Sequence, residues 1–532
     1  MGPDKIFEEA AGLSQIDIMR LRTNSSLEDA RGMRRMGKEQ QLVRKFRLIS
    51  VTSFAAITTV CWEMGLFFIS PALINGGRTG LIWSLVWTFV GFGPIYLSMA
   101  EMASMAPTCG AQYHWVSEFA PESCQQLLSF LTGWISTLAW QAGNAEGVWF
   151  IACLVQTLVT VGTDAQTPFT GWQTALVAIG CVMLAYLANI YGAMALPYWQ
   201  VPVFAIHILA YFAYVIPIWV SAPVVTSHKD VWSDFRGRGG WSSAGLSVLV
   251  GQLTGVGIQA GLETGTHMAE EVKDSSVAVP WSILNVYVSN FCLILPAAIT
   301  VCYHIEDLDT ALADPTTYPA IYVLRAAMTR NWQLAMLSVI FFINFMSGIN
   351  YLAAVTRDLF AFSRDHGLPF SKWLATIHPK RRVPKNACFT SCVIATVLCV
   401  ANVASSVTLN SLTSLLVVAL LHCYCFSIGC CLWRRIYHPG SLPTARFSLG
   451  RWGIPINALA VGFASWFFFW STWPTFYPVT AANFNWSSVV FVGLGIFALA
   501  YFYIRGKDIY KGPVATVEGR GRRGCSRDET RL

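Results

Sequence analysis

The hydrophobic residues of this chain fall into long apolar runs that are separated by short polar stretches. An α-helix needs about 20 consecutive apolar residues to cross the hydrocarbon core of a bilayer, and the runs reach that length. The pattern therefore predicts an all-α membrane protein that is embedded in a lipid bilayer. The twelve predicted spans are at about 49–73, 81–105, 127–160, 172–193, 197–221, 245–270, 279–303, 332–362, 386–404, 407–433, 453–473 and 485–505.

The sixth predicted span is interrupted by glycines. Gly257 and Gly261 are two of five glycines between Gly251 and Gly265, and a carboxylate, Glu263, follows closely. Each glycine destabilises a helix interior by roughly 1 kcal/mol relative to alanine, so the cluster predicts a break in the helix. In hydrocarbon a break is tolerated only where the freed backbone groups face protein, water or a ligand. Close helix packing would explain the glycines but not the glutamate, so we interpret the stretch as a substrate site.

The first predicted span carries a polar interruption at a corresponding place. Trp62, Glu63, Met64 and Gly65 lie near its middle. A carboxylate at this depth costs about 2.5–3.5 kcal/mol on insertion scales, so Glu63 is expected to face a cavity or a partner. Interruptions at matching places in two halves indicate an inverted repeat. We therefore predict a 5+5 inverted-repeat transporter fold with broken helices 1 and 6, and we assign these four residues to substrate binding.

Four further polar residues lie within apolar spans. Gln141 and Glu146 are in the middle of the third span, His207 is in the fifth and Asn344 is in the eighth. Gln141 and Asn344 are added to the predicted substrate site. His207 is a candidate for proton coupling because histidine titrates nearest neutral pH, although a buried core histidine is the commoner case. Glu146 is a second coupling candidate, and a neutralised, hydrogen-bonded acid is the alternative.

The charged residues indicate how the chain is oriented. Charged residues make up 12% of the chain, well below the roughly 25% of soluble proteins. With the predicted spans, 30 of the 36 Lys and Arg residues fall on the side of the amino terminus, which predicts that both termini are cytoplasmic. The predicted organisation is a tail at 1–48, a transporter domain at 49–505 and a tail at 506–532. Orientation or anionic lipid accounts for the basic tails, so no nucleic-acid partner is expected.

Two charged pairs lie at the inner end of the eighth predicted span. Arg357 and Asp358 are followed by Arg364 and Asp365. They are interpreted either as cytoplasmic anchors, which is the commoner role, or as an inner gate of ion pairs.

The chain shows no pattern typical of an enzyme. Its 15 cysteines lie mostly within spans, and no zinc-type spacing with histidine accompanies them. No nucleophile–base set and no phosphate-binding loop is visible, so we expect no metal and no cofactor. The oligomeric state stays open.

Several motifs resemble the fungal amino acid/choline transporter family of the amino acid–polyamine–organocation superfamily. The matching sequences are WE at 62–63, NGGRTG, AEMASMAPTCGAQYHW, GWISTLAWQ at 133–141, HMAEEVKDSSVAVP at 267–280 and AFSRDHGLPFSKWLATIHPKRRVPKNA at 361–387. The resemblance implies the inverted-repeat fold and proton-driven uptake of amino acids, gamma-aminobutyrate (GABA), choline or polyamines. In related bacterial transporters a lysine on the fifth span replaces a sodium ion, and His207 is the candidate for that place. Glu146 departs from the family pattern, which favours a small or apolar residue there, and so does Glu263, where aspartate is usual.

These observations predict a secondary active permease that imports a small amino acid or amine together with protons. The substrate amine would meet Glu63, Glu263 or freed carbonyl groups, and a substrate carboxylate would meet freed N–H groups. The competing hypothesis is a nutrient sensor of the same fold that binds without transporting. The plasma membrane is the predicted location, with the vacuolar membrane as the alternative.

Overall fold

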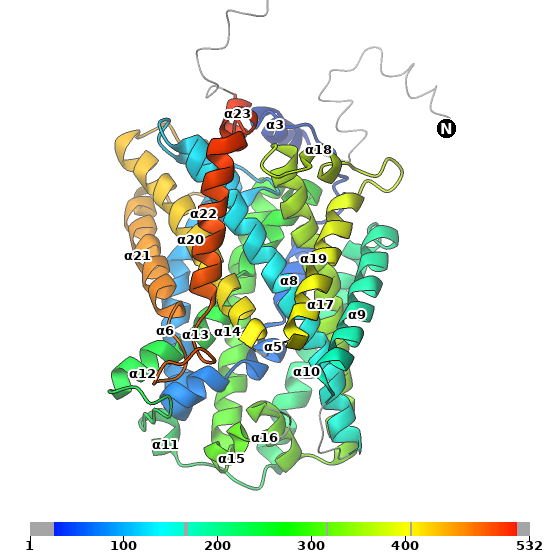
Figure 1. Cartoon of the computed structure of the whole chain (residues 1–532), viewed down its shortest axis with the longest axis vertical. Helices are drawn as coiled ribbons and strands as arrows, with labels where there is room; N and C mark the ends of the chain where they lie inside the picture. The colour runs from blue at the N-terminus through cyan, green and yellow to red at the C-terminus, as the bar shows by residue number, and fades with distance from the viewer. Residues whose placement is uncertain (1–25, 164–168, 315, 317, 405–406, 519–532) are drawn as a thin grey trace, which may run out of the picture.

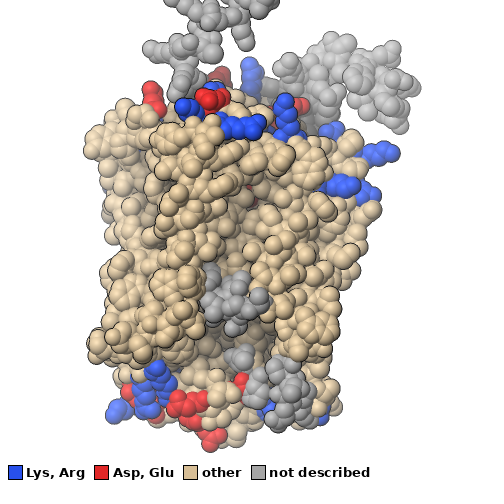
Figure 2. Space-filling model, viewed as in Figure 1, with Lys and Arg blue, Asp and Glu red and all other residues tan. Residues whose placement is uncertain are grey.

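Twelve helical segments long and apolar enough to cross a membrane occupy the described part of the chain. This computed structural model describes residues 26–163, 169–314, 316, 318–404 and 407–518. The segments run between two charged ends, and uncharged side chains form a belt between them (Figures 1 and 2). The predicted all-α membrane fold is confirmed. The spans are α4 (Leu48–Thr59) with α5 (Cys61–Phe67), α6 (Ser70–Met105), α8 (Gln125–Thr163), α9 (Gly171–Tyr191), α10 (Leu196–Ser221), α12 (Ala244–Gly251) with α13 (Leu253–Gln259) and η2 (Leu262–Glu271), α14 (Ser275–His304), α17 (Arg330–Arg364), α19 (Lys385–Ala404), α20 (Val407–Tyr437), α21 (Gly453–Ser471) and α22 (Ser487–Tyr501).

Shorter helices lie at the two ends of the bundle. We call the end with α3 and α23 the terminal end, and the end with α11, α15 and α16 the opposite end (Figure 1). The short elements are α3 (Leu27–Arg35), α7 (Ala111–Phe119), α11 (His228–Trp232), α15 (Leu308–Leu312), α16 (Pro319–Ala327), α18 (Ser371–Leu374), η3 (Gly450–Trp452), η4 (Phe502–Gly506), α23 (Lys507–Ile509) and η5 (Pro513–Ala515).

The first span breaks at Val60, which separates α4 from α5. Val60 has a left-handed backbone with φ +36°, although a β-branched residue rarely adopts that region. The hydroxyl of Ser347 donates to the carbonyl of Thr58 at 2.8 Å, so a backbone group freed at the break has a partner. The sequence predicted the break within the stretch Trp62–Gly65. In the structure the break lies before that stretch, which is helical within α5.

The sixth span breaks at Gly261, between α13 and η2. Gly261 has φ +84°, a conformation that glycine adopts without the steric cost of a Cβ atom. The N–H of Gly261 donates to the hydroxyl of Tyr424 at 3.1 Å, and the N–H of Leu262 donates to the hydroxyl of Tyr96 at 3.2 Å. The Tyr96 hydroxyl in turn donates to the carbonyl of Gln259. Two tyrosines thus satisfy the broken backbone inside the membrane, where water cannot do so.

The boundary between the first two spans differs from the prediction of 49–73 and 81–105. Helix α5 ends at Phe67, and α6 begins at Ser70 and kinks at Gly77, where φ is +65°. Both sides of this boundary are apolar, so hydropathy alone could not locate the turn.

The two broken spans lie beside each other. Helix α4 packs against η2, and α5 packs against α13, so the breaks at Val60 and Gly261 are neighbours in the bundle. Helices α17 and α20 contact these spans, and α8 packs against both α17 and α20. This arrangement places freed backbone groups from both halves of the fold around one interior space.

Candidate functional site

A cavity of about 160 Å³ lies at the two breaks. Its walls come from α4, α5, α6, α8, α13, α17 and α20. Six of the eleven residues predicted from the sequence line it, and these are Met64, Gly65, Glu146, Gly257, Gly261 and Asn344. The remaining five, Trp62, Glu63, Gln141, His207 and Glu263, lie elsewhere.

The cavity wall is largely apolar and aromatic. The rings of Phe68 and Phe150 lie 5.5 Å apart, and those of Trp140 and Tyr351 lie 5.5 Å apart, measured between centroids. Among the described lining residues Glu146 is the only carboxylate, and Lys, Arg and His are absent. Apolar walls with a few placed polar groups are typical of small-molecule sites.

Glu146 projects from α8 toward α20. Its side chain is 3% exposed, and its Oε1 accepts a hydrogen bond from the hydroxyl of Thr413 at 2.7 Å. Because Thr413 also lines the cavity, the carboxylate is held at the cavity wall between these two helices.

The break in the sixth span supplies hydrogen-bond acceptors to the cavity. In an unbroken helix the N–H groups of Gly261 and Leu262 would bond the carbonyls of Gly257 and Ile258. Both N–H groups donate instead to tyrosine hydroxyls, so these two carbonyls lose their helical donors. Gly257 and Ile258 both line the cavity. Asn344 donates its amide to Ile340 at 2.9 Å, which leaves its side-chain oxygen as a further acceptor.

Replacing Gly261 by alanine is expected to destabilise the protein while leaving membrane insertion intact. The left-handed backbone at φ +84° costs an L-residue about 1–2 kcal/mol. Gly257→Ala is the matched control, since Gly257 is helical and the nearest atom to an added Cβ lies 3.8 Å away. Thermal unfolding of the purified proteins should show a lower midpoint for Gly261→Ala only, and uptake should fall in the double variant. Equal midpoints for the two single variants would show that the left-handed backbone at Gly261 does not require glycine for stability.

Trp62, Glu63 and His207 form a buried contact on the other side of α5. Oε1 of Glu63 lies 2.6 Å from Nδ1 of His207, and both side chains are buried. The ring centroid of Trp62 lies 6.1 Å from that of His207, 5.9 Å from Tyr211 and 5.7 Å from Tyr214. These residues join α5 to α10 and do not line the cavity. Ionisable residues within a membrane tend to pair with one another, a rule that would have suggested this pair from the sequence.

Gln141 and Glu263 also face away from the cavity. The amide of Gln141 donates to the hydroxyl of Ser391 at 2.9 Å, which joins α8 to α19. Glu263 lies beyond the break, toward the terminal end, where it accepts hydrogen bonds from Tyr424 at 2.7 Å and from Gln112 at 3.0 Å.

Ion pairs close the bundle between the cavity and the terminal end. Glu271, at the end of η2, lies 2.8 Å from both Lys45 and Arg357. Its neighbour Glu270 lies 2.7 Å from Arg364. The acids come from the sixth span, the arginines from the eighth, and the lysine from the segment before α4. Arg357 and Arg364 of the eighth span are thus held in ion pairs with the end of the sixth span at the terminal end of the bundle.

The segment between α3 and α4 runs alongside the end of η2. The N–H groups of Lys45 and Phe46 donate to the carbonyl of Glu271 at 2.8 and 3.0 Å, and the N–H of Lys273 donates to the carbonyl of Phe46 at 2.9 Å. Phe46 and Val272 form an isolated parallel β-bridge. Part of the predicted amino-terminal tail is therefore integrated into the closed end of the bundle.

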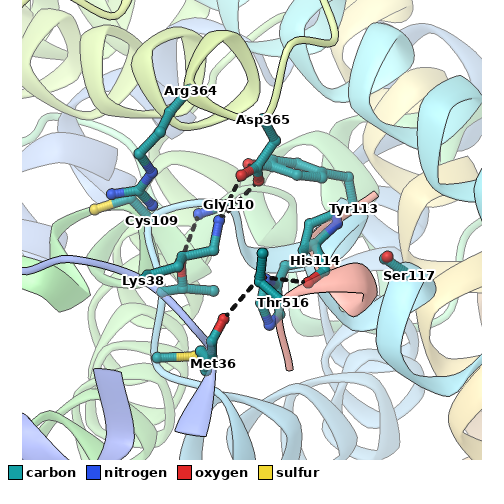
Figure 3. A network of polar contacts seen from close by, with 12 residues as sticks. Met36, Lys38, Cys109, Gly110, Tyr113, His114, Ser117, Arg364, Asp365 and Thr516 are labelled. Atoms are coloured by element: carbon teal, nitrogen blue, oxygen red, sulfur yellow. Dashed lines mark hydrogen bonds and ion pairs between the residues drawn. The ribbon is translucent and has the colours of Figure 1, made fainter. Parts of the chain in front are cut away.

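The two terminal segments meet at this end, as Figure 3 shows. Nζ of Lys38 lies 2.7 Å from a carboxylate oxygen of Asp365, which also accepts from the hydroxyl of Tyr113 at 2.9 Å. The hydroxyl of Thr516 donates to the carbonyl of Met36 at 3.1 Å. Burial lowers the pKa of Lys38, and the Asp365 carboxylate opposes that shift.

A second acid anchors α3 to α7. Glu118 lies 2.7 Å from Arg35 and 3.5 Å from His114. Burial raises the pKa of Glu118, but the contacts with His114 and Arg35 outweigh burial and lower the pKa to about 2. The carboxylate therefore stays ionised, and the contact holds, throughout the physiological pH range.

A cavity at two discontinuous helices, with ion pairs at one end of the bundle, is the arrangement typical of many membrane transporters. The chain belongs to the amino acid permease family, whose sequence profile matches residues 48–496. It is accordingly a multi-pass membrane transporter and not an enzyme.

Three curated relatives match along most of their length. The GABA-specific permease of Saccharomyces cerevisiae is 26% identical, covering 92% of this chain and 87% of that protein. Amino-acid permease 2 of Neurospora crassa is 26% identical, covering 92% and 90%. The choline transporter of Saccharomyces cerevisiae is 25% identical, covering 90% and 84%. The family resemblance inferred from the sequence motifs is thereby confirmed.

Proposed function

We propose that the protein imports a small amino acid or amine and that proton entry drives the import. The observation that carries this proposal is the buried contact between Glu63 on α5 and His207 on α10, with 2.6 Å between the two side chains. Histidine is the side chain that titrates nearest neutral pH. The contact joins one half of a broken helix to a neighbouring span, so a proton there would act on elements that move in alternating access.

The proton acts by changing the strength of this contact. A neutral His207 donates a hydrogen bond to the Glu63 carboxylate, whereas a protonated His207 adds the attraction between two opposite charges, which is strong in a low-dielectric interior. Protonation therefore favours the conformation in which α5 packs on α10, and proton release favours its separation. A ligand shifts a conformational equilibrium only through such a difference in affinity between the two states.

The terminal end is proposed to face the cytoplasm. The distribution of Lys and Arg supports this orientation, because 30 of the 36 fall on the side of the termini. Ion pairs such as Glu271–Arg357 then close the cavity from the cytoplasm in this conformation. We place the protein in the plasma membrane, and fluorescence imaging of a tagged chain distinguishes this from the vacuolar membrane.

Substrate recognition is proposed to use the cavity at the two breaks. GABA carries a protonated primary amine and choline a quaternary ammonium group, so the names of these two relatives support a cationic nitrogen as the common feature. Freed carbonyls at Gly257 and Ile258 provide acceptors for the N–H groups of a protonated amine.

Uptake into proteoliposomes tests this function. We expect the wild-type protein to accumulate labelled GABA, choline or a polyamine when the outside is acidic, and a protonophore to abolish the accumulation. His207→Ala and Glu63→Gln should lose gradient-driven accumulation, and His228→Ala, at the opposite end of the bundle, should keep it. If His207→Ala leaves the pH profile unchanged, His207 is a core residue and Glu146 becomes the next candidate. Binding without any transport by the wild type would favour the nutrient sensor.

A further inference from the structure

The cavity contains an acid whose charge is not balanced by a described cationic side chain. Glu146 is buried, and Thr413 is the hydrogen-bond partner recorded for it within the described residues. The described lining residues include no Lys, Arg or His. A buried carboxylate that lacks a counter-charge is costly, so a cation that enters the cavity would relieve that cost.

The rest of the wall also suits a positive charge. The rings of Phe68, Phe150, Trp140 and Tyr351 line the cavity, and aromatic faces attract ammonium groups. The freed carbonyls at the end of α13 add hydrogen-bond acceptors. The two other acids near the breaks have partners outside the cavity, since Glu63 contacts His207 and Glu263 accepts from Tyr424 and Gln112. Glu146 is therefore the acid positioned to bind a positively charged group of a solute in the cavity.

We propose that the cavity selects a small organic cation with one net positive charge, whose ammonium or quaternary ammonium group pairs with Glu146. This inference rests on the proposed transport function, because it assigns the substrate of the same cavity. An uncharged solute leaves the Glu146 charge uncompensated, a zwitterion brings its own carboxylate into a cavity whose described lining has no Lys, Arg or His, and an anion adds a like charge. The volume of about 160 Å³ lies below the roughly 300–1,000 Å³ of drug-sized sites, which fits a small amine.

Calorimetric titration of the full-length protein in lipid nanodiscs tests the substrate class without any proton gradient. The probes are choline, butylamine, the zwitterion GABA and the uncharged isostere of choline in which a tert-butyl group replaces the trimethylammonium group. We expect choline or butylamine to bind the wild type at least about thirtyfold more tightly than the uncharged isostere. Glu146→Gln should lose that preference, and Glu146→Asp should retain it. Glu122→Gln, an exposed position at the terminal end, is the matched control and should behave as the wild type.

Three results would overturn the inference. They are equal affinity for choline and its uncharged isostere, failure of both cations to bind the wild type, and unchanged cation affinity in a Glu146→Gln variant that keeps its thermal unfolding midpoint. The outcome is independent of the transport assay. Glu146-dependent cation binding without gradient-driven uptake would retain the substrate class and refute coupled import. Coupled uptake of a zwitterion that binds better than either cation would refute the substrate class and retain coupled import.

Discussion

Replacing Glu271 by glutamine is expected to destabilise the closed protein by about 3–5 kcal/mol, because it leaves the buried Arg357 and the partly buried Lys45 without their shared acid. Glu271 lies 2.8 Å from both Lys45 and Arg357, and its side chain is 3% exposed. The amide keeps the size of the side chain but removes its charge. The terminal end of the bundle should therefore open or unfold more readily than in the wild type.

Two measurements check this expectation. The thermal unfolding midpoint of the purified variant should fall, and labelling of the buried Cys109 by a maleimide should become faster in a background that retains only this cysteine. Glu28→Gln is the matched control, since the Glu28–Arg31 pair is exposed on both sides and such pairs contribute at most about 1 kcal/mol. If Glu271→Gln and Glu28→Gln have the same midpoint and the same labelling rate, the ion pairs at Glu271 do not close this end.

Tyr424→Phe is expected to destabilise the break in the sixth span by about 3 kcal/mol. The lost hydroxyl donates to Glu263 at 2.7 Å and accepts the N–H of Gly261 at 3.1 Å. Its removal leaves a buried carboxylate with Gln112 as its remaining described side-chain donor and leaves a backbone N–H unsatisfied. Both consequences are costly inside a membrane, where water does not replace the missing partner.

Tyr96→Phe is the matched variant, because Tyr96 bridges the same break through neutral groups, the carbonyl of Gln259 and the N–H of Leu262. Hydrogen bonds to a charged group are worth more than neutral ones, so we expect the smaller effect for Tyr96→Phe. Thermal unfolding and uptake of the two variants, at matched membrane levels, give the comparison. A Tyr424→Phe protein as stable as the wild type would show that the Glu263 side chain does not depend on this hydroxyl.

The hydropathy pattern was sufficient for the number of spans but not for the turn between the first two, and glycine chemistry was sufficient for the sixth break. Gly261 is the residue at which the sixth helix ends, as its φ of +84° requires. The break at Val60 could not be predicted, since nothing in a β-branched residue signals a left-handed backbone. It depends on a tertiary contact, in which Ser347 from the eighth span bonds the carbonyl of Thr58.

The candidate site was only partly visible in the sequence for a geometric reason. Neighbouring positions on a helix point about 100° apart, so Met64 and Gly65 line the cavity while Glu63 turns toward α10. Because apolar residues occur on every face of α5, its sequence has no amphipathic pattern that identifies the face toward the cavity. The tendency of intramembrane ionisable residues to pair suggests His207 as a partner for Glu63, but the two are 144 positions apart and only the packed helices establish the contact.

The ten residues of η2, Leu262–Glu271, form a 3₁₀ helix, although runs longer than three or four residues are uncommon. A 3₁₀ helix rises about 2.0 Å per residue and an α-helix about 1.5 Å, so this segment spans about 20 Å instead of about 15 Å. Rewinding it as an α-helix would draw Glu270 and Glu271 about 5 Å, nearly one α-helical pitch, away from Arg364 and Arg357. The ion pairs of Glu270 and Glu271 at the terminal end therefore depend on the 3₁₀ form of this segment, since rewinding it would separate both acids from their arginines.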